Sequence, residues 1–237
     1  MPDTCEVRTA VIIPTLNEAE HIGALLAHLQ ASEAAADCIV VDAQSLDDTA
    51  AIAQAHGAQV VNSAVASRAV QMNLGAAHTN AELLYFVHAD TRPPKTWFTD
   101  ITNAAQAGHA LGGYRFKFDS KRPLLKLNSW FTRFNLLTFR GGDQSLFVKR
   151  GLWDALEGFN PELCIMEEYD LMQRAKAAGE AFCLLKGATR VSARKYEHNG
   201  YLQVQRANFV AMRDYKRGLT SEAIRSNYYR MLRHPKA

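Results

Sequence analysis

The chain has 237 residues, of which 48% are hydrophobic and 22% charged, which is enough apolar material for a sizeable core and excludes a disordered chain. No apolar run approaches the ~18 residues of a membrane span, and the first residues lack the basic and apolar segments of a secretory signal. The four cysteines form no CxxC pair, which favours reduced thiols. We therefore expect a globular, cytoplasmic protein.

The net charge of +3 is unevenly distributed along the chain. Residues 190–237 contain eleven Lys and Arg against three acids, whereas residues 1–189 are net acidic. A basic terminal segment favours contact with anionic ligands or with an anionic membrane surface.

The first 110 residues alternate short apolar runs with helical patterns. β-branched, apolar runs predict buried strands at Thr9–Pro14, Cys38–Asp42, Gln59–Val61 and Leu83–Val87. Apolar residues at helical spacing predict helices at Glu18–Gln30, Asp47–His56 and Ser67–Ala77. Continuous apolar strands separated by helices predict a parallel sheet that is covered on both faces, and Pro14 is expected to end the first strand.

The second half has a less regular pattern. We predict strands at Gly112–Phe118 and Gln144–Val148, and helices at Pro123–Thr138, Glu167–Ala178, Tyr201–Lys216 and Ser221–Leu232. No linker, repeat or low-complexity segment interrupts the chain. We therefore expect a single domain over residues 1–237, with a first part to about residue 110, a second to about 200, and C-terminal helices over 201–237.

Polar side chains follow the first, second and fourth predicted strands. The carboxyl ends of parallel strands form the usual ligand site of an α/β sheet. No glycine-rich phosphate motif follows the first strand, so a backbone cradle for a dinucleotide is disfavoured. Asp42 can accept from a base N–H or a ribose hydroxyl, and Thr15, Asn17 and Ser45 can bond a pyrimidine edge, although Ser45 also suits a turn.

The fourth strand is followed by His88 and Asp90, two residues apart. A carboxylate at a strand end suits a hard divalent ion that is shared with a diphosphate. The alternative is that Asp90 only begins the turn before Pro93.

Five segments occur in order over about residues 10–180: "VIIPTLNEAE", "VVDAQSLDDT", "HADTRPP", "GGDQSLFVKR" and "MEEYDLMQRAKAAG". Together they resemble family 2 glycosyltransferases of the GT-A fold, and the run from "SARKYEHNGY" to "SNYYR" resembles a bacterial subgroup with poorly defined substrates. The resemblance implies an α/β GT-A fold with a mainly parallel central sheet, helices on both faces and a helical C-terminal extension. It also implies inverting transfer of a sugar from a nucleotide-diphosphate sugar, here most simply a UDP-sugar, to an acceptor hydroxyl.

The resemblance assigns roles to residues that match the family motifs. The residues implied to bind the nucleotide are Pro14, Thr15, Asn17, Glu18, Asp42, Ser45, Arg68 and His88. Asp90 and His198 match metal-binding positions, and they imply Mn²⁺ or Mg²⁺ as cofactor. The first Asp of the family's Asp-x-Asp motif is His88 here, so a ribose or indirect contact is implied for it; His198 can also be a solvated loop residue.

The general base is implied to be Glu168, where the family usually has Asp, one methylene shorter. Asp170 is a second candidate base, although residues two apart on a helix do not share a face. Glu167 and Glu168 can also serve only to complement the helix dipole. The residues implied to contact the acceptor or the sugar are Gly113, Asp143, Gln144, Glu167 and Arg194.

The segment from Lys121 to Arg140 contains five Lys and Arg, no acid, and several aromatic residues. This composition suits a helix in a membrane interface, or a helix packed on the sheet. The first alternative would mean a peripheral association with the inner face of a membrane and a lipid-linked acceptor, and the second leaves the acceptor open. We expect no nucleic-acid partner. The alternatives are a nucleotidyltransferase, which would need a Gly- and Lys/Arg-rich first loop, and a non-catalytic membrane or partner module.

Overall fold

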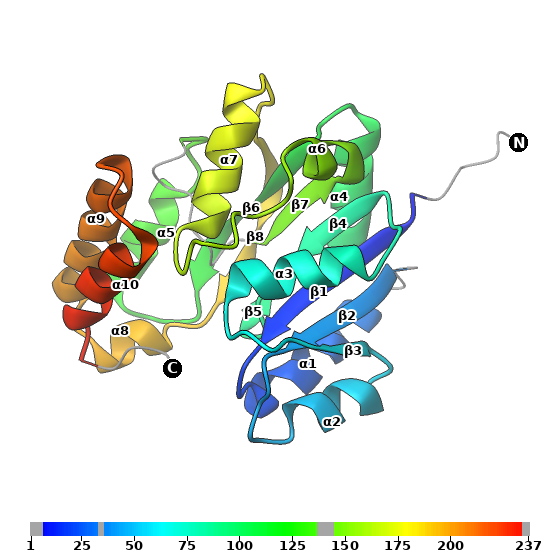
Figure 1. Ribbon diagram of the computed structural model, residues 1–237, viewed down its shortest axis with the longest axis horizontal. Helices are drawn as coiled ribbons and strands as arrows, with labels where there is room; N and C mark the ends of the chain where they lie inside the picture. Colours follow the sequence, from blue (N-terminus) through cyan, green and yellow to red (C-terminus); the bar gives the residue numbers. More distant parts are fainter. Residues whose placement is uncertain (1–6, 33–35, 137–144, 234–237) are drawn as a thin grey trace, which may run out of the picture.

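The structure is a computed structural model, and it describes residues 7–32, 36–136 and 145–233 (Figure 1). The strands are β1 (Thr9–Thr15), β2 (Ala36–Asp42), β3 (Gln59–Asn62), β4 (Leu83–Phe86), β5 (Thr91–Arg92), β6 (Leu111–Phe118), β7 (Leu146–Lys149) and β8 (Cys183–Val191). The helices are α1 (Ala19–Gln30), α2 (Thr49–Ala55), α3 (Arg68–Ala77), α4 (Trp97–Gln106), α5 (Pro123–Phe131), α6 (Arg150–Ala155), α7 (Glu167–Ala177), α8 (Arg194–His198), α9 (Tyr201–Lys216) and α10 (Ser221–Arg230).

The described strands form one eight-stranded mixed sheet in the order β3-β2-β1-β4-β7-β6-β8-β5. β1 runs parallel to β2 and β4, and β2 runs parallel to β3. β7 is antiparallel to both of its neighbours, β6 and β8 are parallel to each other, and β5 is antiparallel to β8. The predicted mainly parallel centre is confirmed, and strands from both predicted halves lie in the same sheet.

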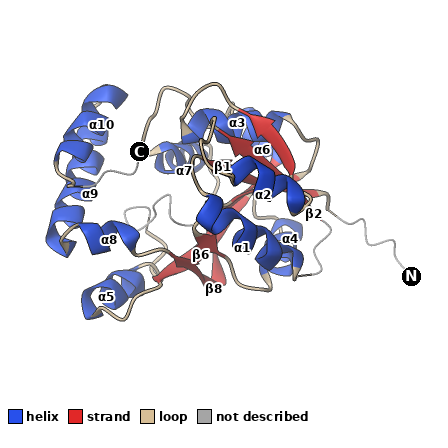
Figure 2. Ribbon diagram, turned by 90° about the horizontal axis from the view of Figure 1, so that it is seen from below, coloured by secondary structure: helices blue, strands red, loops and turns tan. Residues whose placement is uncertain are grey.

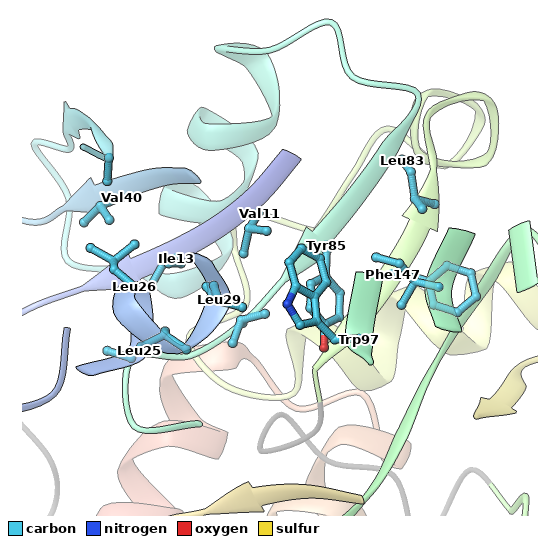
Figure 3. Packing of buried hydrophobic residues seen from close by; sticks show 14 of the residues in the cluster. Val11, Ile13, Leu25, Leu26, Leu29, Val40, Leu83, Tyr85, Trp97 and Phe147 are labelled. Carbon is cyan, nitrogen blue, oxygen red and sulfur yellow. The ribbon is translucent and has the colours of Figure 1, made fainter. Parts of the chain in front are cut away.

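Both faces of the sheet are buried, because successive side chains of a strand point to opposite faces. Val11 and Ile13 of β1 belong to a cluster that α1, α2 and α4 cover. Ala10 and Ile12 belong to a second cluster, which α3, α6 and α7 cover. Figure 3 shows the first cluster, in which the Tyr85 ring stacks on that of Trp97 with 5.2 Å between centroids.

Several predicted boundaries need correction. β1 continues past Pro14, because Pro14 still pairs with Val41 and the oxygen of Thr15 accepts from the N–H of Ala43. The helix predicted over Pro123–Thr138 ends at Phe131, because the Thr132 hydroxyl is bonded to the backbone of β6. The prediction contained no helix at α4, although its buried residues Trp97, Ile101, Ala104 and Ala105 lie at helical spacing.

The C-terminal helices lie to one side of the sheet together with α5 and α8 (Figures 1 and 2). Their own small core consists of Leu125, Ala193, Tyr196, Val204, Ala207 and Leu232. Ile165, just before α7, joins Ala211 and Ile224 in a further small cluster. In the described part of the chain, no helix is long and apolar enough to cross a membrane.

Candidate functional site

The carboxyl ends of β1, β2 and β4 lie at one edge of the sheet, because these three strands are parallel and adjacent. Asp42, at the end of β2, is 3% exposed. Its carboxylate accepts from the Thr15 hydroxyl at 3.0 Å, the Ser45 hydroxyl at 2.6 Å and the Ser45 N–H at 2.8 Å. A carboxylate can accept about four hydrogen bonds, so these partners fix Asp42 and leave capacity for a ligand.

The loops after β1 and β2 hold each other in place. The Asn17 N–H donates to the Ser45 hydroxyl at 2.8 Å, and the Asn17 side-chain oxygen accepts from the Leu46 N–H at 2.8 Å. Asn17 and Gln44 have positive φ angles of 52° and 59°, a conformation that costs strain in non-glycine residues and occurs often at functional sites. Asn17 therefore has a clear structural role in shaping the loops.

Two side chains outside the predicted set also shape this edge. The Gln71 amide of α3 donates to the carbonyl oxygens of Thr15 and Val41 at 2.9 and 2.8 Å, and so ties the ends of β1 and β2 together. The Thr49 hydroxyl accepts from the Glu18 N–H at 2.9 Å. A signal for Gln71 existed in the sequence, because it lies among apolar residues of a helix face. Pro14 is buried in β1.

Asp90 and Glu18 share a cation from the C-terminal part of the chain. The Arg194 guanidinium lies 3.2 Å from the Asp90 carboxylate and 3.4 Å from that of Glu18. Arg194 is the first residue of α8, so this short helix reaches back to the ends of β1 and β4. The structure thus brings together three residues that the sequence assigned to nucleotide, metal and sugar, and it shows that this place accepts positive charge.

His88 and Glu168 form a second pair. The His88 Nε2 atom lies 3.2 Å from Oε1 of Glu168, whose side chain is almost fully buried at the start of α7. An ionised carboxylate can only accept, so Nε2 of His88 carries the hydrogen. Burial alone raises the pKa of Glu168, but the hydrogen bond from His88 and the charges of Arg68 and His88 outweigh it and lower the pKa. Glu168 is therefore ionised at neutral pH.

Glu167 has the opposite electrostatic situation. Its carboxylate is fully buried and lies 2.7 Å from Nε of Arg68, the first residue of α3. Neither carboxylate oxygen has a hydrogen bond of good geometry within the described residues. Burial raises the pKa of Glu167 above its usual range, the charge of Arg68 opposes this, and the neighbouring charge of Glu168 adds to it.

The start of α7 sets the direction of these two carboxylates. Met166, just before the helix, adopts a left-handed conformation with φ 76°. A carboxylate in the first turn of a helix is stabilised by the helix dipole, so Glu167 and Glu168 also gain from their place. The dipole explanation does not account for the two different partners, Arg68 and His88, which come from α3 and from the end of β4.

Asp170, the second candidate base, has other partners. Its carboxylate accepts from Nε of Arg174 at 2.7 Å and from the Tyr215 hydroxyl at 2.7 Å. These contacts place Asp170 where α7 meets α9. This position disfavours a role as base and indicates a structural role.

The other residues that the sequence predicted for the site are His198, Gly113, Asp143 and Gln144. His198 is exposed at the end of α8, one helical turn beyond Arg194. A Cβ atom on Gly113 would come within 2.3 Å of the Ser145 carbonyl oxygen, so the close approach that requires this glycine is made by the sheet rather than by a sugar. Asp143 and Gln144 lie outside the described residues.

The described residues contain no group of three or more His, Cys, Asp or Glu side chains arranged to hold a metal ion. Asp90 is the carboxylate of this edge that lies at the predicted metal position. Mg²⁺ and related ions are often held by one or two carboxylates together with substrate phosphates, so a complete protein cage is not required.

Comparison with known proteins identifies the family. Residues 10–162 match the model of glycosyl transferase family 2. The chain belongs to this family. A 4,4'-diaponeurosporenoate glycosyltransferase from Staphylococcus haemolyticus (strain JCSC1435) is 35% identical over 88 residues, which are 34% of this chain and 24% of that protein. The match thus spans about a quarter of this relative's length.

Solved structures of similar fold include the following three. The mannosyltransferase PcManGT from Pyrobaculum calidifontis, in complex with GDP-Man and Mn²⁺, has a TM-score of 0.70 at 18% identity, over 95% of this chain and 69% of that one. S. aureus TarS 1–349 in complex with UDP-GlcNAc has a TM-score of 0.67 at 18% identity, over 86% and 65%. Glucosyl-3-phosphoglycerate synthase from Mycobacterium tuberculosis, in complex with Mn²⁺, UDP and glucosyl-3-phosphoglycerate, has a TM-score of 0.62 at 17% identity, over 97% and 81%. These likenesses show that the fold is the GT-A fold.

Proposed function

We propose that the protein is an inverting glycosyltransferase that moves a sugar from a UDP-sugar to an acceptor hydroxyl, with Glu168 as the general base. The observation that carries this proposal is the buried Glu168 carboxylate, which His88 holds at the edge where β1, β2 and β4 end. A carboxylate that is held ionised near this edge supports a role as general base. Family membership favours this function over a nucleotidyltransferase or a non-catalytic module.

The donor nucleotide is proposed to lie over the ends of β1 and β2. Asp42 is fixed by Thr15 and Ser45, and its remaining acceptor capacity suits a base N–H or a ribose hydroxyl. Arg68 places a positive charge at the same edge, held by Glu167. UDP rather than GDP is proposed because two of the three similar structures contain a uridine nucleotide, and this choice is open to direct test.

A divalent cation, Mn²⁺ or Mg²⁺, is the proposed cofactor, and the residues present fit it. Asp90 offers carboxylate oxygens at the end of β4, and Arg194 already places a cation against Asp90 and Glu18. Asp90 would hold the metal, with His198 as a second proposed ligand one turn along α8 from Arg194. When bound, the cation would neutralise charge on the leaving diphosphate.

The chemical step needs a base on the acceptor side. The acceptor oxygen attacks the anomeric carbon, the bond from that carbon to the diphosphate breaks, and the hydroxyl proton passes to Glu168. His88 keeps the Glu168 carboxylate oriented and ionised through its Nε2–H. Arg194 remains close enough to stabilise negative charge on the departing diphosphate.

The acceptor is proposed to be a lipid-linked or membrane-proximal hydroxyl at the inner face of the membrane, with Glu167 on its side, whereas Arg194, which pairs with Asp90 and Glu18, is proposed to lie on the side of the donor sugar and its diphosphate. The support is the basic, aromatic composition around α5. We likewise propose that residues 1–237 form a single domain, whose parts meet at about residues 110 and 200. The support for a single domain is the one sheet that both halves share.

The test uses water as the acceptor, because water can replace the acceptor hydroxyl as the nucleophile that gives its proton to Glu168. UDP and GDP are first titrated calorimetrically with and without Mn²⁺. UDP-glucose and UDP-GlcNAc are then incubated with the enzyme, and the first-formed sugar is assigned by ¹H NMR. We expect metal-dependent UDP binding and release of the inverted β-anomer. Release of the α-anomer would overturn the inverting mechanism, and binding of GDP but not UDP would overturn the donor.

A further inference from the structure

The solvent-exposed face of α5 is apolar, and so is that of the turn after it. A helix that packs on a domain usually exposes charged and polar side chains instead. Leu124, Leu127 and Trp130 are 51%, 52% and 43% exposed. Phe131, Phe134 and Leu136 are also largely exposed. Large apolar side chains scattered singly on a surface need no explanation, but six within thirteen residues mark an interaction site.

The inward face of the same segment is already occupied. Leu125 is 1% exposed and belongs to the core of the C-terminal helices. Thr132 is equally buried against the backbone of β6. Trp130 packs on Phe131 and Phe134, with ring centroids 5.2 and 5.1 Å apart, and the clusters of buried described residues do not include these rings. Within the described residues, these three rings therefore lie outside the buried clusters.

The charged side chains within this segment have one sign. Lys121, Arg122, Lys126 and Arg133 are exposed, and no acid occurs from residue 121 to residue 140. The Arg133 guanidinium lies over the Trp130 ring, 4.7 Å from its centroid. Such a pair presents an apolar body and a charged head together, which is the arrangement that membrane interfaces favour.

A neighbouring helix repeats the pattern. On α9, Leu202 and Phe209 are 79% and 68% exposed, and the exposed Arg206 lies between them on the same face. α5 and α9 share the core that contains Leu125 and Val204. Exposed apolar and basic side chains therefore occur on both of the helices that share this core.

We propose that the α5 surface, defined as Leu124, Leu127, Trp130, Phe131, Phe134 and Leu136 with the four cations, docks on an anionic lipid bilayer. The apolar side chains would enter the boundary between headgroups and acyl chains, and the cations would contact anionic headgroups. Each cation near an anionic surface adds about five-fold in affinity. The binding is therefore expected to be reversible and sensitive to salt.

A second copy of the chain is a poorer occupant. A symmetric dimer would place the α5 surface on itself, and it would bring four cations against the same four cations with no acid in the segment to pair them. An anionic bilayer supplies the missing opposite charge.

The α5 surface is connected to the proposed active site. The Arg122 guanidinium donates to the carbonyl oxygen of Tyr196 at 2.7 Å, and Tyr196 lies in α8, whose first residue is Arg194. Arg194 in turn contacts Asp90. Docking would thus hold the site close to a lipid-linked acceptor, a consequence that rests on the proposed function, whereas the docking itself does not.

The test is co-sedimentation of the full chain with phosphatidylcholine vesicles, with and without phosphatidylglycerol, at low and high salt. Tryptophan emission adds a local probe, because Trp97 and Trp153 are buried and only the third tryptophan, Trp130, is exposed. We expect sedimentation with anionic vesicles at low salt and a blue shift of the emission. Absence of binding, binding that ignores salt, or an unshifted emission would overturn the proposal.

Two double variants locate the contact. Leu127→Ser with Trp130→Ser, and Lys126→Glu with Arg133→Glu, should each weaken vesicle binding at least about ten-fold. The matched controls are Val65→Ser, an exposed apolar residue elsewhere, and Lys95→Glu with Lys176→Glu, which should bind vesicles as the parent chain does. Every variant is also titrated with UDP and Mn²⁺. A variant that binds UDP normally but does not bind vesicles has lost docking and not the donor site. Sedimentation equilibrium tests for a second copy as the occupant. If the parent chain is a dimer and the Leu127/Trp130 variant is a monomer, a second copy occupies the α5 surface and the bilayer proposal is wrong.

Discussion

The sheet with its flanking helices and the group formed by α5 and α8–α10 are built differently. The sheet separates two large buried clusters, one on each face, and its parallel strands deliver polar side chains to a common edge. The C-terminal group has two small clusters and displays exposed Leu, Phe and Trp between basic residues. The first region specifies where a ligand can bind, and the second supplies cations and an outer surface.

The site depends on both regions. Asp42, Asp90 and Glu18 come from strand ends of the first region, whereas Arg194 comes from α8. Tyr215 of α9 donates to Asp170 and so supports α7, the helix that carries Glu168. Part of the positive charge of the C-terminal segment is thus neutralised at the site, where Arg194 of α8 pairs with the carboxylates of Glu18 and Asp90.

The largest expected effect comes from Glu168→Gln, which keeps the volume of the side chain and removes the base. General base catalysis contributes about 10²- to 10⁴-fold, so transfer or donor hydrolysis should fall by this factor while UDP and Mn²⁺ binding is retained. Steady-state rates and calorimetric titration measure the two quantities.

Asp170→Asn is the matched control, two residues along the same helix. Because the Asp170 carboxylate binds Arg174 and Tyr215, its loss should lower stability more than it lowers the rate. A Glu168→Gln enzyme that still transfers sugar, next to an inactive Asp170→Asn enzyme, would assign the base to Asp170.

The second prediction asks whether the two regions unfold together. Leu26 is fully buried under the sheet, and Leu26→Ala should cost about 2–5 kcal/mol of global stability. Ile224→Ala empties part of a three-residue cluster in the C-terminal helices, so it should open α9 and α10 locally. Hydrogen exchange distinguishes the cases, with Val65→Ala as an exposed control. Equal acceleration of exchange in β1 and α9 by Ile224→Ala would show that both regions form one cooperative unit.

The sequence predicted much of the first region, because most of its strands are continuous apolar runs and most of its helices carry regular apolar spacing, but it missed α4, α6, β5 and β8. The ends of β2 and β3 and the extent of α9 differ little from the predicted ranges. The end of α5 could not be predicted in the same way, since it depends on a tertiary hydrogen bond between Thr132 and β6. The short helix α8 has too few residues for a periodic pattern.

The site was predicted as a set of residues but not as a set of pairs. Strand-end position was enough to select Asp42, His88 and Asp90. The pairing of His88 with Glu168 joins residues 80 positions apart, and no local pattern encodes such a contact. The role of Gly113 also required the structure, because only the sheet register brings the Ser145 carbonyl against it.

The third prediction concerns the contact between the regions. Asp90→Asn should weaken Mn²⁺-dependent UDP binding about ten-fold or more, because a neutral amide is a poor ligand for a divalent cation, whereas its oxygen can still accept from Arg194. The melting temperature should stay close to that of the parent chain. Asp154→Asn, an exposed carboxylate of α6, is the control. Unchanged metal dependence in the Asp90 variant would remove Asp90 from the metal site.

The smallest expected effect compares two neighbouring carboxylates through pH. The pKa of Glu168 is lowered in the folded chain, so its contribution to stability is present above the unfolded pKa of about 4.3 and is lost as the pH falls toward the lowered value. The pKa of Glu167 is raised, so stability declines as the pH rises from about 4.3 toward the raised value. We compare the melting temperature of each variant with that of the parent chain at the same pH. As the pH rises, this difference should become more positive for Glu167→Gln and more negative for Glu168→Gln. Thermal unfolding measured from about pH 2 to about pH 8 should show differences of a few degrees of opposite sign, which develop below about pH 4.3 for Glu168→Gln and above it for Glu167→Gln. The exposed Glu20→Gln variant should stay unchanged throughout. Parallel curves for the two variants would mean that Arg68 and His88 do not distinguish these carboxylates.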